Sequence, residues 1–199
     1  RAKGSMLRPE RQFLQIGAEC IGESSYFADI EMIELAYNAL SSVGIKEISI
    51  ELSSRVFLDK FYSYINLSPK INKIKSLIKK KDINNALKLI EHKHHQYLKD
   101  IFSCTGNFLS MKKNLNKLKF DNTNKKEIND LVSIYKVFLN KYPSTPFFLD
   151  LTEVDDKNYH SSIRFTIFAN NVRGEIARGG RYISINSDIH NPLTVEWGR

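Results

Sequence analysis

The spacing of hydrophobic residues changes twice along the chain, from a strand-like period to a helix-like period and back. Residues 12–21 alternate with period two, so we predict a strand there with one wholly apolar face. That face carries Leu14, Ile16, Ala18 and Cys20. The other face places Gln15 and Glu19 on either side of Gly17, and a glycine inside a strand often marks the close approach of a ligand. The segment therefore predicts the floor of a small-molecule pocket.

A helix and a second strand follow this segment. Apolar residues recur at helical spacing from Asp29 to Val43, and Gly44 supplies a left-handed stop. Residues 46–52 alternate again, which predicts a half-buried strand. Its inward positions are Ile48, Ile50 and Leu52. This order of elements indicates a sheet with at least one covered face.

Residues 57–142 differ in kind, because their pattern is helical throughout and they are rich in lysine and asparagine. Four helices are predicted from start signals and apolar spacing. The first is expected to start at Ser68-Pro69 and the second at Asp82. The third is indicated by the apolar residues of 108–118, and the fourth by a capping-box pair formed by Asn124 and Glu127. We therefore predict a helical insertion over 57–142 that packs on a sheet domain formed by 1–56 and 143–199.

The strand pattern returns after this block, beginning with the apolar run 147–151. Residues 162–169 alternate, with Ile163, Phe165 and Ile167 on one face and Arg164, Thr166 and Phe168 on the other. Asn170-Asn171 indicates a turn before a short strand at 175–178. Gly179-Gly180-Arg181-Tyr182 follows and has two interpretations. It is either a tight glycine turn that offers Arg181 to an anion, or a hairpin turn with a surface arginine.

Composition adds limits to this picture. The 199 residues are 42% hydrophobic and 26% charged, as in ordinary globular domains, and no apolar run approaches the ~20 residues of a membrane span. Cys20 and Cys104 stand singly in apolar surroundings, which favours reduced thiols over a disulfide or a metal site. We therefore expect a cytoplasmic protein with no membrane contact and no cofactor.

The basic charge raises the question of nucleic acid. The net charge is +8, and much of the excess lysine lies in 79–81 and 112–126, mixed with asparagine and isoleucine rather than with a reading motif. Because basic charge alone gives only non-specific affinity, we favour a lysine-coated helical surface over an RNA-binding patch.

One histidine cluster, residues 91–95, has metal-like spacing. His92 and His95 lie one helical turn apart, as two ligands would, but the surrounding sequence favours a solvated helix face. We therefore predict no metal site.

Three segments together resemble the histidyl-tRNA synthetase-like catalytic fold, which is built on the antiparallel sheet of class II synthetases. They are QFLQIGAECIGESSYFADIEMIELA, DLTEVDDKNYHSSIRFTIFA and EIARGGRY, in the order of that family and at roughly its separation. The resemblance implies an α+β fold with a mixed, mainly antiparallel sheet, flanking helices and a helical insertion. It begins mid-fold, with Arg1 at the position of the motif 2 arginine, so we expect the first strands, motif 1 and the motif 3 helix to be absent.

Two branches share this fold: the synthetase, and the regulatory subunit of ATP phosphoribosyltransferase. Where the synthetase has the signature RGLDYY, this chain has DDKNYH, with Asp155 at the arginine position and His160 at the second tyrosine. An acid at that position removes the charge that binds a carboxylate and stabilises adenylate formation. The acid of the GGRYD signature is also replaced, by Ile183. These departures favour the regulatory branch.

Membership of that branch implies a subunit with no catalytic residues of its own. It would self-associate and would assemble with the short-form catalytic phosphoribosyltransferase. It would also convey inhibition by histidine, which requires that histidine bind one state of the assembly more tightly than another. The candidate residues of a histidine-like pocket are Arg1, Gln15, Glu19, Tyr159, Arg181 and Tyr182. The alternative is a vestigial pocket whose polar residues only bond one another.

Two other functions compete with this interpretation. A divergent histidyl-tRNA synthetase would catalyse histidine-dependent exchange of pyrophosphate into ATP, and Asp155 argues against it. An RNA-binding module with a synthetase-like fold would bind RNA with steep salt dependence, but no aromatic–basic motif supports it.

Overall fold

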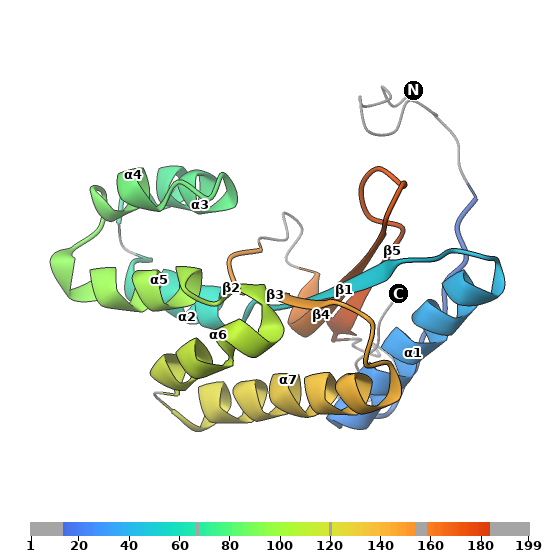
Figure 1. The fold of residues 1–199 in the computed structure, drawn as a ribbon. Coiled ribbons are helices and arrows are strands. Elements are labelled where there is room, and N and C mark those ends of the chain that lie inside the picture. Colours follow the sequence, from blue (N-terminus) through green and yellow to red (C-terminus); the bar gives the residue numbers. More distant parts are fainter. Residues whose placement is uncertain (1–13, 67, 120, 154–158, 184–199) are drawn as a thin grey trace, which may run out of the picture.

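A single mixed sheet forms the centre of the computed structural model, which describes residues 14–66, 68–119, 121–153 and 159–183. Its strands are β1 (Ile48–Ser54), β2 (Thr105–Asn107), β3 (Phe147–Asp150), β4 (His160–Ala169) and β5 (Ala177–Tyr182). They lie in the order β2-β3-β1-β4-β5 (Figure 1). β1 and β3 run parallel, and the other three pairs are antiparallel. The predicted α+β class with a mainly antiparallel sheet is confirmed.

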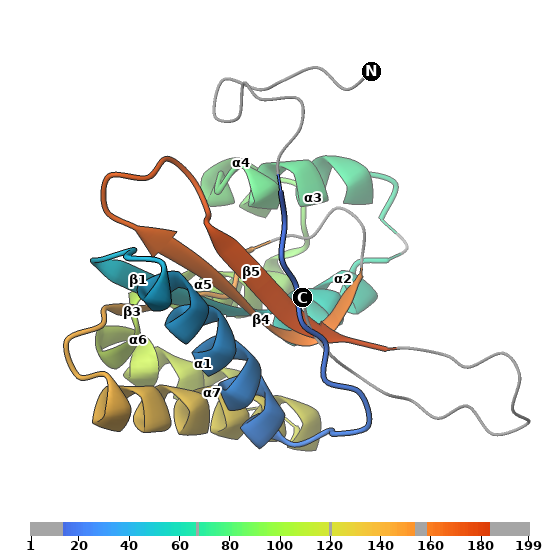
Figure 2. The ribbon, with the colours of Figure 1, turned by 90° about the vertical axis from the view of Figure 1, so that its right-hand side faces the viewer.

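Helices flank this sheet on both sides. They are α1 (Tyr26–Ser42), α2 (Val56–Tyr64), α3 (Ile71–Lys79), α4 (Ile83–Leu87), α5 (His95–Phe102), α6 (Phe108–Leu115) and α7 (Asn122–Lys141), with short 3-10 turns η1 (His92–His94) and η2 (Asn116–Leu118). α1 and α7 lie next to each other against one face of the sheet, whereas α3 and α4 lie on its other side (Figures 1 and 2). We call the face toward α1 and α7 the helix face, and the other the opposite face.

The hydrophobic core lies between the helix face and these helices. Residues aligned across β1 and β4 supply its centre, and all are at most 4% exposed: Ile50 with Ile167, and Leu52 with Phe165. Phe147 of β3 extends the core, with its ring centroid 5.4 Å from that of Phe138 in α7 and 6.4 Å from that of Phe108 in α6. Truncating a buried phenylalanine to alanine typically costs about 3–5 kcal/mol, so these contacts contribute substantially to the attachment of α6 and α7.

The strand predicted over 12–21 is not formed by residues 14–21, and positions 12–13 lie outside the described residues. Leu14 and Ile16, two members of the expected apolar face, are 101% and 98% exposed. A strand requires a hydrogen-bonded neighbour, and the backbone of 14–21 makes no hydrogen bond to another described segment. The alternation was real, but a period-two pattern cannot by itself provide a partner strand.

The segment 57–142 is mainly helical, as predicted, but not throughout. β2 lies within it and pairs antiparallel with β3, with Gly106 opposite Leu149. The strand has only three residues, and Gly106 adopts a φ of 134°. So short and polar a strand carries no hydrophobic period, which is why the sequence did not indicate it. The division into a sheet domain and an insertion stays a prediction.

The predicted helix ends are partly corrected. Gly44, the second residue after the end of α1, takes the left-handed φ expected of a helix stop, at 86°, and Asp82 accepts a hydrogen bond from the backbone N–H of Asn85 at 3.2 Å. At the start of α7 the cap is not Asn124. Asp121 accepts the N–H of Asn124 at 2.7 Å, and Asn124 itself is buried inside the helix.

Both interpretations of Gly179-Gly180 as a turn are wrong, because the two glycines lie within β5. The turn lies earlier, where Asn171 adopts a φ of 65° in the predicted Asn170-Asn171 pair. Gly180 is needed for space rather than for a left-handed backbone. A Cβ at Gly180 would lie 2.5 Å from Cδ2 of His160 and 2.7 Å from Cγ of Arg164. The glycine therefore lets two β4 side chains lie across β5.

Candidate functional site

Arg181 and Tyr182 occupy neighbouring positions of β5, so their side chains point to opposite faces of the sheet. Tyr182 lies on the opposite face, where its ring stacks on Tyr159 with centroids 5.1 Å apart. Arg181 lies on the helix face. The structure thus brings Tyr159 and Tyr182 together but separates them from the arginine that was expected beside them.

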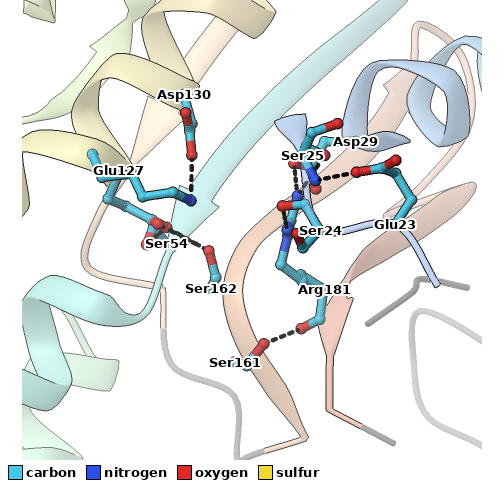
Figure 3. A network of polar contacts seen from close by, with 11 residues as sticks. Glu23, Ser24, Ser25, Asp29, Ser54, Glu127, Asp130, Ser161, Ser162 and Arg181 are labelled. Atoms are coloured by element: carbon cyan, nitrogen blue, oxygen red, sulfur yellow. Dashed lines mark hydrogen bonds and ion pairs between the residues drawn. The ribbon is translucent and has the colours of Figure 1, made fainter. Parts of the chain in front are cut away.

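The guanidinium group of Arg181 is bound inside the protein. It forms an ion pair with Asp29, and it donates to the backbone oxygens of Ser24 and Ser25 (Figure 3). Arg181 is 5% exposed and Asp29 3%, so the arginine is not at the surface. Burial raises the pKa of Asp29 to about 7, and the charge of Arg181 opposes that rise. The contact attaches the start of α1 to the last described strand.

A second buried carboxylate joins the sheet to α7. Glu127 accepts hydrogen bonds from the hydroxyl groups of Ser54 in β1 and Ser162 in β4, the latter at 2.9 Å to each oxygen (Figure 3). Burial raises the pKa of this carboxyl group, and the two serine hydroxyls oppose the rise. The sequence indicated Glu127 only as a capping residue. Its serine partners are 73 and 35 residues away, so no local signal reveals them.

Gln15 lies on the other side of the sheet from the tyrosine pair. Gln15 borders a groove of about 720 Å³ between residues 14–18, α1 and the hairpin that joins β4 to β5. Neither tyrosine lines this groove, and Phe165 and Ala177 place it on the helix face. Glu19 is exposed and does not line the groove. Arg1 lies outside the described residues.

The opposite face carries polar residues that the sequence did not select. Glu51 and Ser53 of β1 align with Thr166 and Arg164 of β4. Arg164 is 9% exposed, and its side chain forms no hydrogen bond or ion pair with the described residues. The sequence could have indicated them, because in both predicted strands they are the polar residues that alternate with the apolar core residues.

An ion-paired cluster occupies the end of β3 on the same face. Lys81 donates to Asp150 at 2.7 Å and to Thr152 at 2.6 Å, and Asp150 also accepts the hydroxyl of Thr105 at 3.2 Å. Lys81 reaches them from a left-handed backbone, with a φ of 59°. These partners satisfy both oxygens of Asp150, so the cluster fastens the α3–α4 connection to the sheet.

Within the histidine cluster, the rings of His92 and His95 lie 4.9 Å apart between centroids, so the predicted spacing of one turn brings them together. Nε2 of His95 lies 3.2 Å from the backbone oxygen of Ile90, and the ring of His94 stacks on Tyr64 at 5.6 Å between centroids. Nowhere in the described ranges do three histidine, cysteine or acidic side chains gather as metal ligands would. Across the same ranges, every helix is too short or too polar to cross a membrane.

Comparison with known proteins assigns the chain to a family. A model of the family described as histidyl-tRNA synthetase matches residues 1–192. The chain belongs to the histidyl-tRNA synthetase family. The resemblance inferred from three sequence segments is therefore confirmed, and it extends over nearly all of the chain.

Within this family, the relatives include proteins of both branches. The chain is 30% identical over 185 residues to the ATP phosphoribosyltransferase regulatory subunit of Rhodospirillum centenum, covering 92% of this chain and 48% of that protein. It is also 30% identical over 190 residues to the histidine–tRNA ligase of Saccharolobus solfataricus, covering 86% of this chain and 42% of the ligase. The chain thus spans about half the length of the curated relatives it matches.

Solved structures of the family share the fold. An ATP phosphoribosyltransferase regulatory subunit/histidyl-tRNA synthetase from Bacillus halodurans aligns with a TM-score of 0.72 and 19% identity, over 90% of this chain and 49% of that one. A chain of the ATP phosphoribosyl transferase (HisG:HisZ) complex from Thermotoga maritima aligns with a TM-score of 0.68 and 17% identity, over 90% and 62%.

Proposed function

We propose that this chain belongs to a non-catalytic regulatory subunit of the short-form ATP phosphoribosyltransferase, in the first step of histidine biosynthesis. The observation that carries the proposal is the similarity to proteins named as that regulatory subunit, such as the one from Rhodospirillum centenum. The partner is the catalytic subunit, as the description of the Thermotoga maritima complex suggests. The subunit acts in the cytoplasm, self-associates and conveys histidine inhibition.

The loss of synthetase chemistry supports the same proposal. Asp155 stands where the synthetase signature has an arginine, and Ile183 stands where it has an acid. Ile183 directly follows β5 and is 50% exposed, so an apolar side chain occupies this position next to Tyr182. Without that cation and acid, a bound amino acid is held but not activated.

The effector pocket of this proposal is centred on the opposite face. Of the six residues that the sequence selected, Tyr159 and Tyr182 form a stacked pair there. Arg181 lies on the helix face, where its ion pair with Asp29 holds in place the strand that carries Tyr182. Gln15 lines the groove on the helix face instead of joining this pair, and Glu19 remains a candidate of the proposal.

The test is to mix the full-length protein with the short-form catalytic subunit from the same source. The formation of phosphoribosyl-ATP is then measured with and without histidine. We expect stimulation by the protein and inhibition by histidine. Absence of a complex, of stimulation and of any histidine effect would overturn the proposal.

The competing function is a divergent histidyl-tRNA synthetase, which the 30% identity to the Saccharolobus solfataricus ligase favours. It requires histidine-dependent exchange of labelled pyrophosphate into ATP by the same preparation. The exchange assay run beside the stimulation assay separates the two, because the regulatory subunit is expected to show stimulation without exchange. Steeply salt-sensitive RNA binding without either activity would instead favour an RNA-binding module.

A further inference from the structure

A small pocket lies where the α6–η2 segment packs against α7 (Figure 1). Its volume is about 220 Å³, and it shares no residue with the groove on the helix face or with the tyrosine pair. Polar side chains from both walls line it: Lys112, Asn116, Lys119, Asn129, Ser133 and Lys136. The pocket is therefore a separate site on the lysine-rich part of the chain.

Three lysines give this pocket a concentrated positive charge. Lys112, Lys119 and Lys136 are exposed, and none of them forms an ion pair or a side-chain hydrogen bond within the part of the chain that the structure describes. Among the described residues that line the pocket, none is acidic. Like charges held around one concavity repel one another, so an anion that enters the pocket lowers their electrostatic energy.

The acidic residues nearby do not supply that anion, because each is engaged elsewhere. The acids of segment 108–141 are Asp121, Glu127 and Asp130. Asp121 pairs with Lys60, and Asp130 pairs with Lys126. Glu127 is buried and accepts hydrogen bonds from serines of β1 and β4. The counter-charge of the pocket therefore has to come from outside this segment.

The two walls of the pocket are fixed relative to each other. The side-chain nitrogen of Asn124, a buried residue of α7, donates to the backbone oxygen of Leu118 in η2 at 2.8 Å. Leu115 and Leu118 are at most 1% exposed, so they anchor the α6–η2 wall in the core. Because the walls need no ordering when a ligand binds, little conformational freedom of the backbone is lost.

The lining indicates which kind of anion fits. None of the described lining residues is an arginine, the side chain whose planar fork matches a carboxylate. Lysine acts as a point charge and is a common ligand of phosphate groups. The volume of about 220 Å³ is also below the roughly 300–1,000 Å³ of pockets for drug-sized ligands. The pocket therefore suits a compact phosphate group rather than a large organic molecule.

The number of cations sets the charge of the ligand. A single phosphate group carries about −1.5 to −2 at pH 7, so three lysines are better matched by two linked phosphates. We propose that the pocket binds a diphosphate group, with Lys112, Lys119 and Lys136 as its cations and Ser133 as a hydroxyl donor. This inference is independent of the proposed function.

The test is calorimetric titration of the full-length protein at low ionic strength with pyrophosphate, ADP, inorganic phosphate and sulfate. Pyrophosphate should bind more tightly than phosphate or sulfate. ADP that binds at least as tightly as pyrophosphate would identify a nucleotide as the source of the diphosphate, and weaker binding of ADP would identify the free anion. Lys136→Gln should weaken pyrophosphate binding about 3- to 10-fold, because one of three charges near the ligand is lost. Lys136→Arg keeps the charge and should retain the affinity within about twofold.

Controls separate a site from a general basic surface. Lys113→Gln is the matched control, because Lys113 follows Lys112 on α6 and is also exposed but does not line the pocket. It removes the same net charge and should change the affinity by less than about twofold, since salt and solvent screen a charge outside the pocket. Without ligand, all three variants should melt at the wild-type temperature, because exposed lysines contribute little to stability. In an NMR titration, pyrophosphate should shift the backbone amide signals of Asn116, Asn129 and Ser133.

Four results would overturn the inference. Equal affinities of wild-type and Lys136→Gln protein, or equal losses for Lys113→Gln and Lys136→Gln, would show that the pocket is not the site. Sulfate binding as tight as that of pyrophosphate would show charge attraction without selection. An RNA duplex that binds more tightly than pyrophosphate, and less tightly to Lys136→Gln, would make these lysines part of an RNA-binding surface.

The proposed function is tested separately, by stimulation of the catalytic subunit. If Lys136→Gln and wild-type protein bind pyrophosphate equally but the catalytic subunit is stimulated and inhibited by histidine, this inference falls and the proposed function stands. If pyrophosphate binds through Lys136 but no catalytic subunit is stimulated, only the proposed function falls.

Discussion

Arg181 of β5 and Asp29 of α1 form a buried ion pair between residues that are 152 positions apart in the sequence. The pair joins the first helix of the described chain to its last strand, and the backbone oxygens of Ser24 and Ser25 accept two further hydrogen bonds from the guanidinium group. Arg181, which the sequence analysis selected as a ligand-binding residue, therefore stabilises the fold.

Removing this arginine should destabilise the protein strongly. We expect Arg181→Met to lower the free energy of unfolding by about 3–5 kcal/mol at pH 8, because it leaves the carboxylate of Asp29 buried without its cation. The loss should be smaller at pH 5, since burial raises the pKa of Asp29 to about 7 and the group can then become neutral. Urea unfolding at the two pH values measures this. Arg178→Met, which breaks an exposed pair with Glu175, should cost less than ~1 kcal/mol. Equal losses for both variants would contradict a buried pair.

Glu127 should make stability depend on pH in a defined direction. Its pKa is raised above the ordinary value of 4.5 by burial, so above pH 4.5 the native state binds more protons than the unfolded state. The contribution of Glu127 is therefore most favourable below pH 4.5 and declines as the pH rises. Glu127→Gln should reduce that decline and be at least as stable as wild-type at pH 8.

Chemical denaturation between pH 4.5 and 8 checks this expectation. Glu31→Gln, at an exposed position of α1, serves as the control and should change stability by less than ~0.5 kcal/mol throughout. A Glu127→Gln protein whose stability falls with pH as steeply as that of wild-type would show that the carboxylate is not the source.

The space at Gly180 can be tested by adding one methyl group. Gly180→Ala should destabilise by about 1–3 kcal/mol, because its Cβ would meet His160 and Arg164 at less than contact distance. Gly17→Ala is the matched control, since nothing lies within 4 Å of a Cβ at that position. Thermal unfolding of both variants measures the two changes in stability. If Gly180→Ala leaves stability unchanged, the side chains of His160 and Arg164 can move aside freely.

The cap of α7 gives a local prediction. Asp121→Ala should lower stability by about 1 kcal/mol, because it removes the acceptor of the Asn124 N–H at 2.7 Å. Thr123→Ala, in the exposed first turn of the same helix, should cost less than half as much. The denaturant midpoints of both variants measure these losses, provided that the slopes of the unfolding transitions are unchanged. A larger loss for Thr123→Ala than for Asp121→Ala would show that Asp121 is not the cap.

The parts of the fold that follow from local chemistry were predictable. Ile50, Leu52, Phe165 and Ile167 fell on the correct face because burial of one side of a strand imposes its period on the sequence. Gly44 could be recognised as a helix stop because its requirement is a backbone angle rather than a partner.

The parts that depend on distant partners were not predictable. Residues 14–21 alternate between apolar and polar side chains as a strand would, yet they form no strand, because no described segment lies beside them to share backbone hydrogen bonds. Gly179-Gly180 looked like a turn because glycine permits one, but Gly180 serves to leave space for Arg164. Whether an arginine is paired, as Arg181 is, or unpaired, as Arg164 is, depends on side chains far away in sequence.

The position of β2 limits how this protein can be engineered or shortened. β2 comes from within the lysine-rich segment 57–142, yet it covers the hydrogen-bonding edge of β3. Excising that segment as if it were a detachable module would uncover a strand edge, which is a template for intermolecular pairing. A minimal version of the protein must therefore retain residues 105–107 or replace them with another edge strand, and a deletion that ignores this should yield aggregates rather than a smaller soluble core.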